Sequence, residues 1–171
     1  MLTACFDDAG DTNPNPPSST STTTTVPPEL TTTTRGLTGV STDFARTVVE
    51  LNGVLYSVAV ADTPEKLAQG LMGVEDLRPL DGMLFVFDGE SVRSFWMKDT
   101  LIPLDVAFFD ADGFLVSTAS MATCPDDDCR RYLSEGVAQF ALETPHGTLE
   151  DLSSDTRLVV VGALDGIGKE I

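Results

Sequence analysis

The sequence predicts an α+β domain that is mainly antiparallel β, barrel-like, and decorated with two short helices. Short runs of β-branched and aromatic residues recur from residue 44 onward, and Gly, Asn, Asp or Pro separate them. Only two short segments carry helix signals. Seven to eight short strands with turns between them are typical of a closed or nearly closed barrel.

The first part of the chain has a different composition. Ser, Thr and Pro fill 18 of the 23 positions from 12 to 34. Such a stretch buries too little apolar surface to offset the entropy lost on ordering. We therefore expect residues 1–42 to form a truncated lipobox and an extended stalk, and residues 43–171 to form the folded domain.

The first elements of the domain have local signals. Residues 47–51 and 54–61 flank Asn52-Gly53, a pair that tolerates the positive φ angles of a type I′ hairpin turn. Thr63 and Pro64 then open a helix that ends near Gly70. We expect further strands over residues 83–87, 92–97, 104–109, 114–120, 137–143 and 157–161, and a second helix over residues 147–152.

The charge balance restricts the partners. The chain has 27 acidic and 10 basic residues, a net charge of −17. A surface of this sign repels phosphate backbones, so we expect no nucleic-acid partner. No run of 18 apolar residues is present, so we expect any membrane contact to be through a lipid anchor alone.

The N-terminus resembles a bacterial lipobox. Leu2-Thr3-Ala4-Cys5 has the leucine, two small residues and cysteine of that motif, followed by the Thr-rich stalk. We expect a native start upstream of Met1, lipidation at Cys5 and export to the cell envelope. The alternative is an ordinary cytosolic terminus with a chance match.

The other two cysteines, Cys124 and Cys129, flank Pro-Asp-Asp-Asp. If Cys5 carries lipid, these two are left to pair, as expected outside the cytosol. The alternative is two free thiols. A metal site is disfavoured because four soft ligands are not available, and we expect no metal and no cofactor.

Three strings carry a family resemblance: GLMG at residues 70–73, GMLFVF at 82–87 and FWMKDTLIPLD at 95–105. They resemble DUF192, a bacterial and archaeal family of small domains with no assigned function. The similarity covers roughly residues 58–162 and implies an α+β barrel-like domain, often exported. This chain has Asp99 where the family more often has asparagine.

The string at residues 95–105 holds the candidate binding site: Trp96, Lys98, Asp99, Thr100 and Asp105. An indole face beside charged groups suits a sugar ring or a peptide end. The alternative is structural: Trp96 fills the core, Lys98 pairs with an aspartate, and Asp105 bonds backbone amides to hold a turn.

Catalysis has weaker support. His146 is the only histidine, and no nucleophile elbow is present. Our expectation is a cell-envelope lipoprotein domain that binds a saccharide or a protein partner. The alternatives are an envelope hydrolase that uses Asp99 and Asp105 as paired carboxylates, and an accessory subunit with a flat apolar patch.

Overall fold

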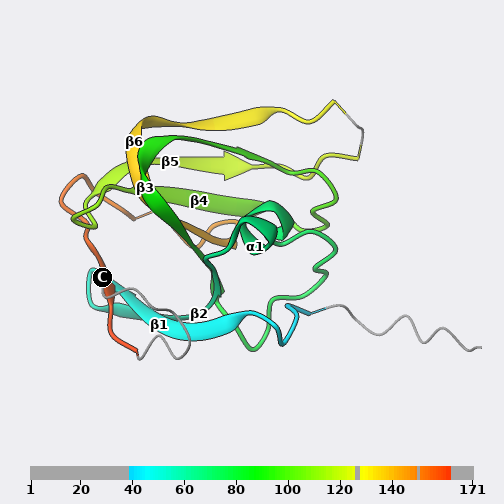
Figure 1. Cartoon of the computed structure of the whole chain (residues 1–171), viewed down its shortest axis with the longest axis horizontal. Helices are drawn as coiled ribbons and strands as arrows, with labels where there is room; N and C mark the ends of the chain where they lie inside the picture. The colour runs from blue at the N-terminus through cyan, green and yellow to red at the C-terminus, as the bar shows by residue number, and fades with distance from the viewer. Residues whose placement is uncertain (1–38, 126–127, 150, 163–171) are drawn as a thin grey trace, which may run out of the picture. The chain divides into compact units, whose positions relative to one another are not determined.

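The described residues form one sheet in the order β5-β4-β6-β3-β2-β1-β7 (Figure 1). A computed structural model of the protein describes residues 39–125, 128–149 and 151–162. All neighbouring strands are antiparallel except β2 and β3, which are parallel. The strands are β1 (Ala45–Leu51), β2 (Val54–Ala61), β3 (Gly82–Trp96), β4 (Leu104–Phe109), β5 (Leu115–Met121), β6 (Arg131–Pro145) and β7 (Leu158–Val160).

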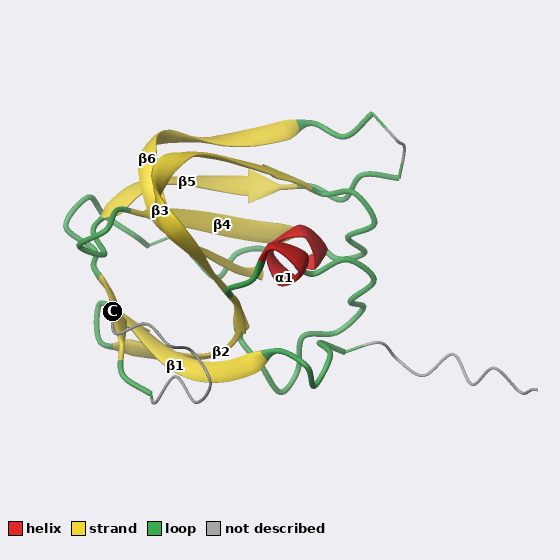
Figure 2. Cartoon of the chain, viewed as in Figure 1, coloured by secondary structure: helices red, strands yellow, loops and turns green. Residues whose placement is uncertain are grey.

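The two 15-residue strands, β3 and β6, curl together over the rest of the sheet (Figure 2). The sequence predicted separate strands over residues 83–87 and 92–97, and the break between them at Asp88-Gly89 was wrong. Val86 pairs with Phe140 and Ser91 with Ala138, so residues 87–90 of β3 face residue 139 alone. Extra residues on one strand make a bulge that bends the strand. Asp88-Gly89 therefore bends β3 and does not end it.

The edges of the curled sheet meet at one end. Phe114 and Arg157, which precede β5 and β7, form an antiparallel bridge. The Leu115 amide donates to the Thr156 carbonyl at 3.0 Å, and the Leu158 amide donates to the Gly113 carbonyl at 2.8 Å. The result is a half-barrel, which confirms the mainly β and barrel-like part of the prediction.

The predicted hairpin and first helix are confirmed. Asn52 and Gly53 have φ angles of 51° and 82°, as the turn between β1 and β2 requires. The single helix of the described residues, α1 (Pro64–Gln69), has the Thr63 side chain accepting the Lys66 amide hydrogen bond at its start. It ends at Gly70, whose φ is 48°.

The second predicted helix, over residues 147–152, was wrong. The described residues of this range form turns and bends. Gly147 has a φ of 86°, which takes the backbone out of the helical region. Its amide donates to the Asp105 carboxylate at 2.6 Å, so a side chain distant in sequence decides the local conformation.

The central strands are buried on both faces. Leu84 and Val86 of β3 pack inside the curled sheet with residues of β1 and β7. The alternate residues, Met83 and Phe85, pack on the opposite face, which α1 and residues 71–80 cover. Burial on both faces explains why these strands are continuous apolar runs in the sequence and do not alternate with polar residues.

Candidate functional site

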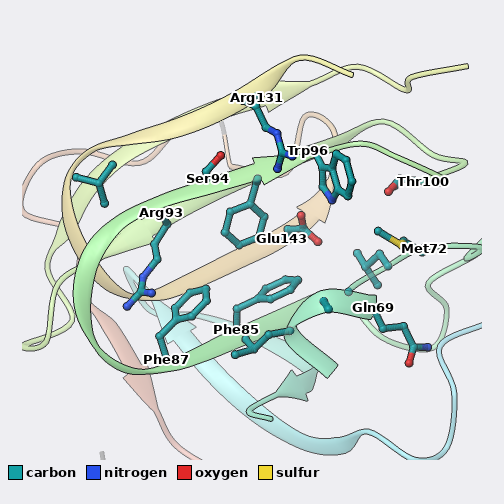
Figure 3. A pocket seen from close by; sticks show the side chains of 16 residues that line it. Gln69, Met72, Phe85, Phe87, Arg93, Ser94, Trp96, Thr100, Arg131 and Glu143 are labelled. Carbon is teal, nitrogen blue, oxygen red and sulfur yellow. The ribbon is translucent and has the colours of Figure 1, made fainter. Parts of the chain in front are cut away.

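A pocket of about 430 Å³ lies between α1 and the curled part of β3 and β6 (Figure 3). Residues 67–72, from α1 and the chain after it, line one side, and residues 92–96 of β3 line another. Its volume lies in the range of small-molecule sites, roughly 300–1,000 Å³. We call this cavity the α1 pocket.

Aromatic side chains form much of the wall of the α1 pocket. Phe95 packs edge-to-face against Phe85, with ring centroids 4.9 Å apart, and against Phe87 at 6.5 Å. Trp96 continues this wall toward the loop that follows β3. Edge-to-face packing holds the rings in defined orientations, so the wall is formed before any ligand arrives.

Two arginines lie on this aromatic wall. The Arg131 guanidinium carbon is 4.2 Å from the centroid of the Trp96 ring, and that of Arg93 is 3.8 Å from the Phe87 ring. Arg93 also donates to the backbone carbonyls of Ala138 and Gly89. Arg93 is therefore held by the protein, whereas Arg131 is exposed and lies within reach of a ligand on the indole.

Glu143 contributes a carboxyl group to the pocket from β6. It is only 4% exposed, and its neighbours across the sheet are Met83 of β3 and Val106 of β4. No hydrogen bond to this carboxyl group is found among the described residues, and no fully buried side-chain oxygen there lacks a partner, so the carboxyl group opens onto the pocket. Burial raises its pKa to about 8, so Glu143 is largely protonated at neutral pH.

The structure brings two of the five predicted site residues to the α1 pocket. Trp96 and Thr100 line it, and Lys98, Asp99 and Asp105 do not. Lys98 and Asp99 form the turn after β3, where Asp99 has a φ of 53°. The Asp99 carbonyl accepts a hydrogen bond from the Gly73 amide at 2.8 Å, which ties this turn to the chain that follows α1.

Asp105 bonds a backbone amide, which is the kind of contact that the structural alternative described. Its buried carboxylate accepts hydrogen bonds from Ser120 Oγ at 2.7 Å and the Gly147 amide at 2.6 Å, and lies 2.8 Å from His146 Nδ1. Burial by itself raises the pKa of Asp105, but these three partners together lower it below its ordinary value. Ser120 donates to the aspartate, whereas in a nucleophile triad the serine hydroxyl bonds the imidazole.

Sequence reasoning missed Glu143 and Arg131. Glu143 appeared only as the end of an apolar strand, residues 137–143. A lone acidic residue that continues such a run, in step with the buried Ala141, is a usable signal of a buried carboxyl group. Arg131 has no such signal, because its place over Trp96 depends on the pairing of β3 with β6.

The remaining predictions concern cysteines and metals. Cys124 and Cys129 form a disulfide bond, as predicted. Cys5 and the stalk lie outside the described residues. Within the described part of the chain, no group of three or more His, Cys, Asp or Glu side chains has a metal-binding arrangement. No helix in that part is long and apolar enough to span a membrane.

The sequence of residues 46–159 matches the DUF192 family, described as "Uncharacterized ACR". This chain belongs to the DUF192 family. The matched range contains every strand from β2 to β6, and thus both β strands that line the α1 pocket. The α1 pocket is therefore a feature of the DUF192 domain itself.

Two solved structures share this fold. A proposed transcription regulator from Sinorhizobium meliloti is 29% identical, covers 68% of this chain and 95% of its own, and superposes with a TM-score of 0.59. A protein of unknown function from Novosphingobium aromaticivorans is 23% identical, with 68% and 84% coverage and a TM-score of 0.57. No curated protein matches the chain.

Proposed function

We propose that the DUF192 domain of this protein is a cell-envelope binding module that takes a saccharide into the α1 pocket. The observation that carries the proposal is a preformed aromatic wall beside a buried carboxyl group in one cavity of about 430 Å³. Ligand sites combine an apolar lining with a few convergent polar groups in this way. Trp96, predicted from the sequence, is part of that wall.

A saccharide suits these groups better than a purely apolar molecule. The apolar faces of sugar rings pack on aromatic side chains, and their hydroxyls need hydrogen-bond partners. Ser94, Thr100, Arg131 and Glu143 supply donors and acceptors around the pocket. A saccharide can therefore pack on the aromatic wall and hydrogen-bond to the buried carboxyl group at the same time.

Paired-carboxylate hydrolysis has less support. It needs two carboxyl groups on either side of the scissile bond, one of them with a raised pKa. Glu143 has the raised pKa, but it is the only acidic residue among the described residues that line the pocket. Asp99 and Asp105, the pair expected from the sequence, do not line the pocket. The Asp105 carboxylate is instead bonded to Ser120, His146 and Gly147.

Two other functions find less support. Transcription regulation, proposed for the Sinorhizobium meliloti relative, is not proposed here because a net charge of −17 repels DNA.

A protein partner remains the second candidate. Leu133, Val137 and Val92 are exposed on the curled ends of β3 and β6, and apolar side chains there favour contact with another protein.

The location in the cell envelope is proposed on the lipobox and the disulfide. Leu2-Thr3-Ala4-Cys5 provides a lipidation site, and the Cys124–Cys129 bond is typical of proteins outside the cytosol. The test is metabolic labelling with tritiated palmitate in bacterial cells, on the chain expressed behind a lipoprotein signal peptide fused before Leu2. Label in the unmodified chain that is lost in Cys5→Ser supports the lipid anchor. Equal label in the unmodified chain and in Cys5→Ser overturns it.

The binding function is tested by saccharide titration of the full chain. Trp96 is the only tryptophan, so its fluorescence reports directly on the α1 pocket. A ligand at 100 times its dissociation constant also stabilises the native state by ~2.7 kcal/mol. We expect a mono- or disaccharide to change the fluorescence and raise the unfolding temperature.

The control separates the pocket from other aromatic surface. Phe114 is exposed and lies under Arg157, with 5.3 Å between the guanidinium carbon and the ring centroid. The thermal shift should vanish in Trp96→Ala and persist in Phe114→Ala. A saccharide shift that survives Trp96→Ala would contradict the α1 pocket as the site, and the absence of any shift would favour the protein-partner candidate.

A further inference from the structure

We propose that the α1 pocket selects a ligand that carries a protonated amine, with Glu143 as its counter-charge. The inference rests on the proposed binding function and names the chemical class of ligand, an amino sugar over a neutral one. Figure 3 shows the Glu143 carboxyl group among the side chains that line the pocket, with Trp96 and Thr100 nearby.

The first step is that no residue of the part of the chain that the structure describes hydrogen-bonds to the Glu143 carboxyl group. The described elements packed around it place Met83 of β3 and Val106 of β4 at its sides, and α1 contributes uncharged residues 67–69 to the pocket. Neither neighbouring strand supplies a hydrogen bond to the carboxyl group, which opens onto the α1 pocket that it lines. A buried polar group in this state is costly unless a ligand satisfies it.

The second step is that neither pocket arginine serves as the counter-charge. Arg93 donates to the carbonyls of Ala138 and Gly89 and lies against Phe87. Arg131 lies over Trp96. Burial is the only influence on the pKa of Glu143, so no cationic side chain lowers it. Since no described side chain supplies a cation for this carboxylate, we assign that role to the ligand.

The third step is the aromatic surrounding. Phe85, Phe95 and Trp96 line the same cavity as Glu143. The faces of aromatic rings attract cations, and most strongly where water is excluded. The acidic balance of the whole chain, −17, also raises the local concentration of cationic ligands. A buried carboxylate next to aromatic rings thus favours an ammonium group over a hydroxyl group.

Binding of an amine should release a proton. Without a ligand, the Glu143 carboxyl group is largely protonated at pH 7 because its pKa is about 8. An adjacent ammonium group lowers that pKa. At pH 6.5 we expect close to one proton released per ligand, measured by calorimetry in two buffers of different ionisation enthalpy. A neutral ligand leaves the carboxyl group protonated and releases none.

The test uses matched ligand pairs on the full chain. Glucosamine is compared with glucose, and benzylammonium with benzyl alcohol, by Trp96 fluorescence and calorimetry. We expect each amine to bind at least 10-fold tighter than its neutral partner, and Glu143→Gln to remove that difference and the proton release. Because proton release is measured on the unmodified protein, the test does not depend on the folding of the variant.

The outcomes separate this inference from the proposed function. Equal binding of glucosamine and glucose, without proton release, overturns the amine inference and leaves the saccharide function standing. Binding of benzylammonium that depends on Glu143, with no binding of either sugar, supports the amine inference and overturns the saccharide function. If none of the four compounds binds, both are overturned.

Discussion

Arg131 and Trp96 face each other across the β3–β6 ladder, and the guanidinium carbon of Arg131 lies 4.2 Å from the centroid of the indole ring. The pair sits where the curled strands pass over the α1 pocket. The same contact between β3 and β6 therefore stabilises the curled strands and shapes the candidate site.

Replacing Arg131 by alanine should expose the Trp96 indole to water and lower the stability of the protein. A cation–π contact at an exposed site contributes ~0.5–1 kcal/mol, so we expect a small loss of stability and a red shift of Trp96 emission. The control is Arg157→Ala, which removes a similar contact with Phe114 at 5.3 Å. An unchanged emission maximum in Arg131→Ala would show that the guanidinium does not shield the indole in solution.

Glu143 should make the protein less stable as the pH rises. Its pKa is raised to about 8 in the folded state from 4.5, so the native state holds more protons than the unfolded state between these values. Stability is therefore greatest below about pH 4.5 as far as this group is concerned, and falls as the pH rises toward 8.

Glu143→Gln should remove this dependence. Gln has no proton to lose, so we expect a gain of up to about 3 kcal/mol at pH 7 relative to the unmodified chain, and no gain at pH 4. Urea unfolding at both pH values measures the difference. Glu135→Gln on the exposed part of β6 is the control, and a gain of equal size at pH 4 and pH 7 would contradict a buried, protonated Glu143.

Asp105→Asn should destabilise the protein. The variant weakens bonds to Ser120, His146 and the Gly147 amide, and a disrupted buried hydrogen-bond group costs ~1–3 kcal/mol. Because the pKa of Asp105 is lowered, its contribution is present above the unfolded pKa and is lost as the pH falls through the folded value.

Thermal unfolding at pH 7 and at pH 3 measures this effect. The difference between Asp105→Asn and the unmodified chain should be large at pH 7 and smaller in acid. Asp112→Asn, at an exposed turn position, should change little at either pH. If Asp105→Asn unfolds at the same temperature as the unmodified chain, the three bonds do not stabilise the fold.

Loss of the disulfide should cost little. The Cys124–Cys129 bond closes a loop with a sequence separation of 5, and a loop this short constrains the unfolded chain by about 2 kcal/mol. We expect Cys129→Ser to lower the unfolding temperature by a few degrees while the far-ultraviolet spectrum stays unchanged. Cys5→Ser serves as the control, and loss of the folded spectrum in Cys129→Ser would assign the bond a larger role.

The sequence determined the elements whose signals are local. Asn52-Gly53 specifies the hairpin because both residues accept positive φ, and Thr63, Pro64 and Gly70 delimit α1 by capping. The pairing of Cys124 and Cys129 was predicted from the cysteine count, because lipidation of Cys5 leaves these two. The family string pointed to Trp96, which does lie in the pocket.

Only the tertiary structure decided where charged groups meet. Asp105 and His146 are 41 residues apart, yet their side chains lie 2.8 Å apart, and the associated Gly147 turn replaced a predicted helix. The bulge at residues 87–90 depends on pairing with β6. Glu143 became a pocket carboxyl group because β3, β4 and α1 enclose it. Local patterns determine backbone preference, whereas desolvation and charge pairing depend on neighbours that chain topology supplies.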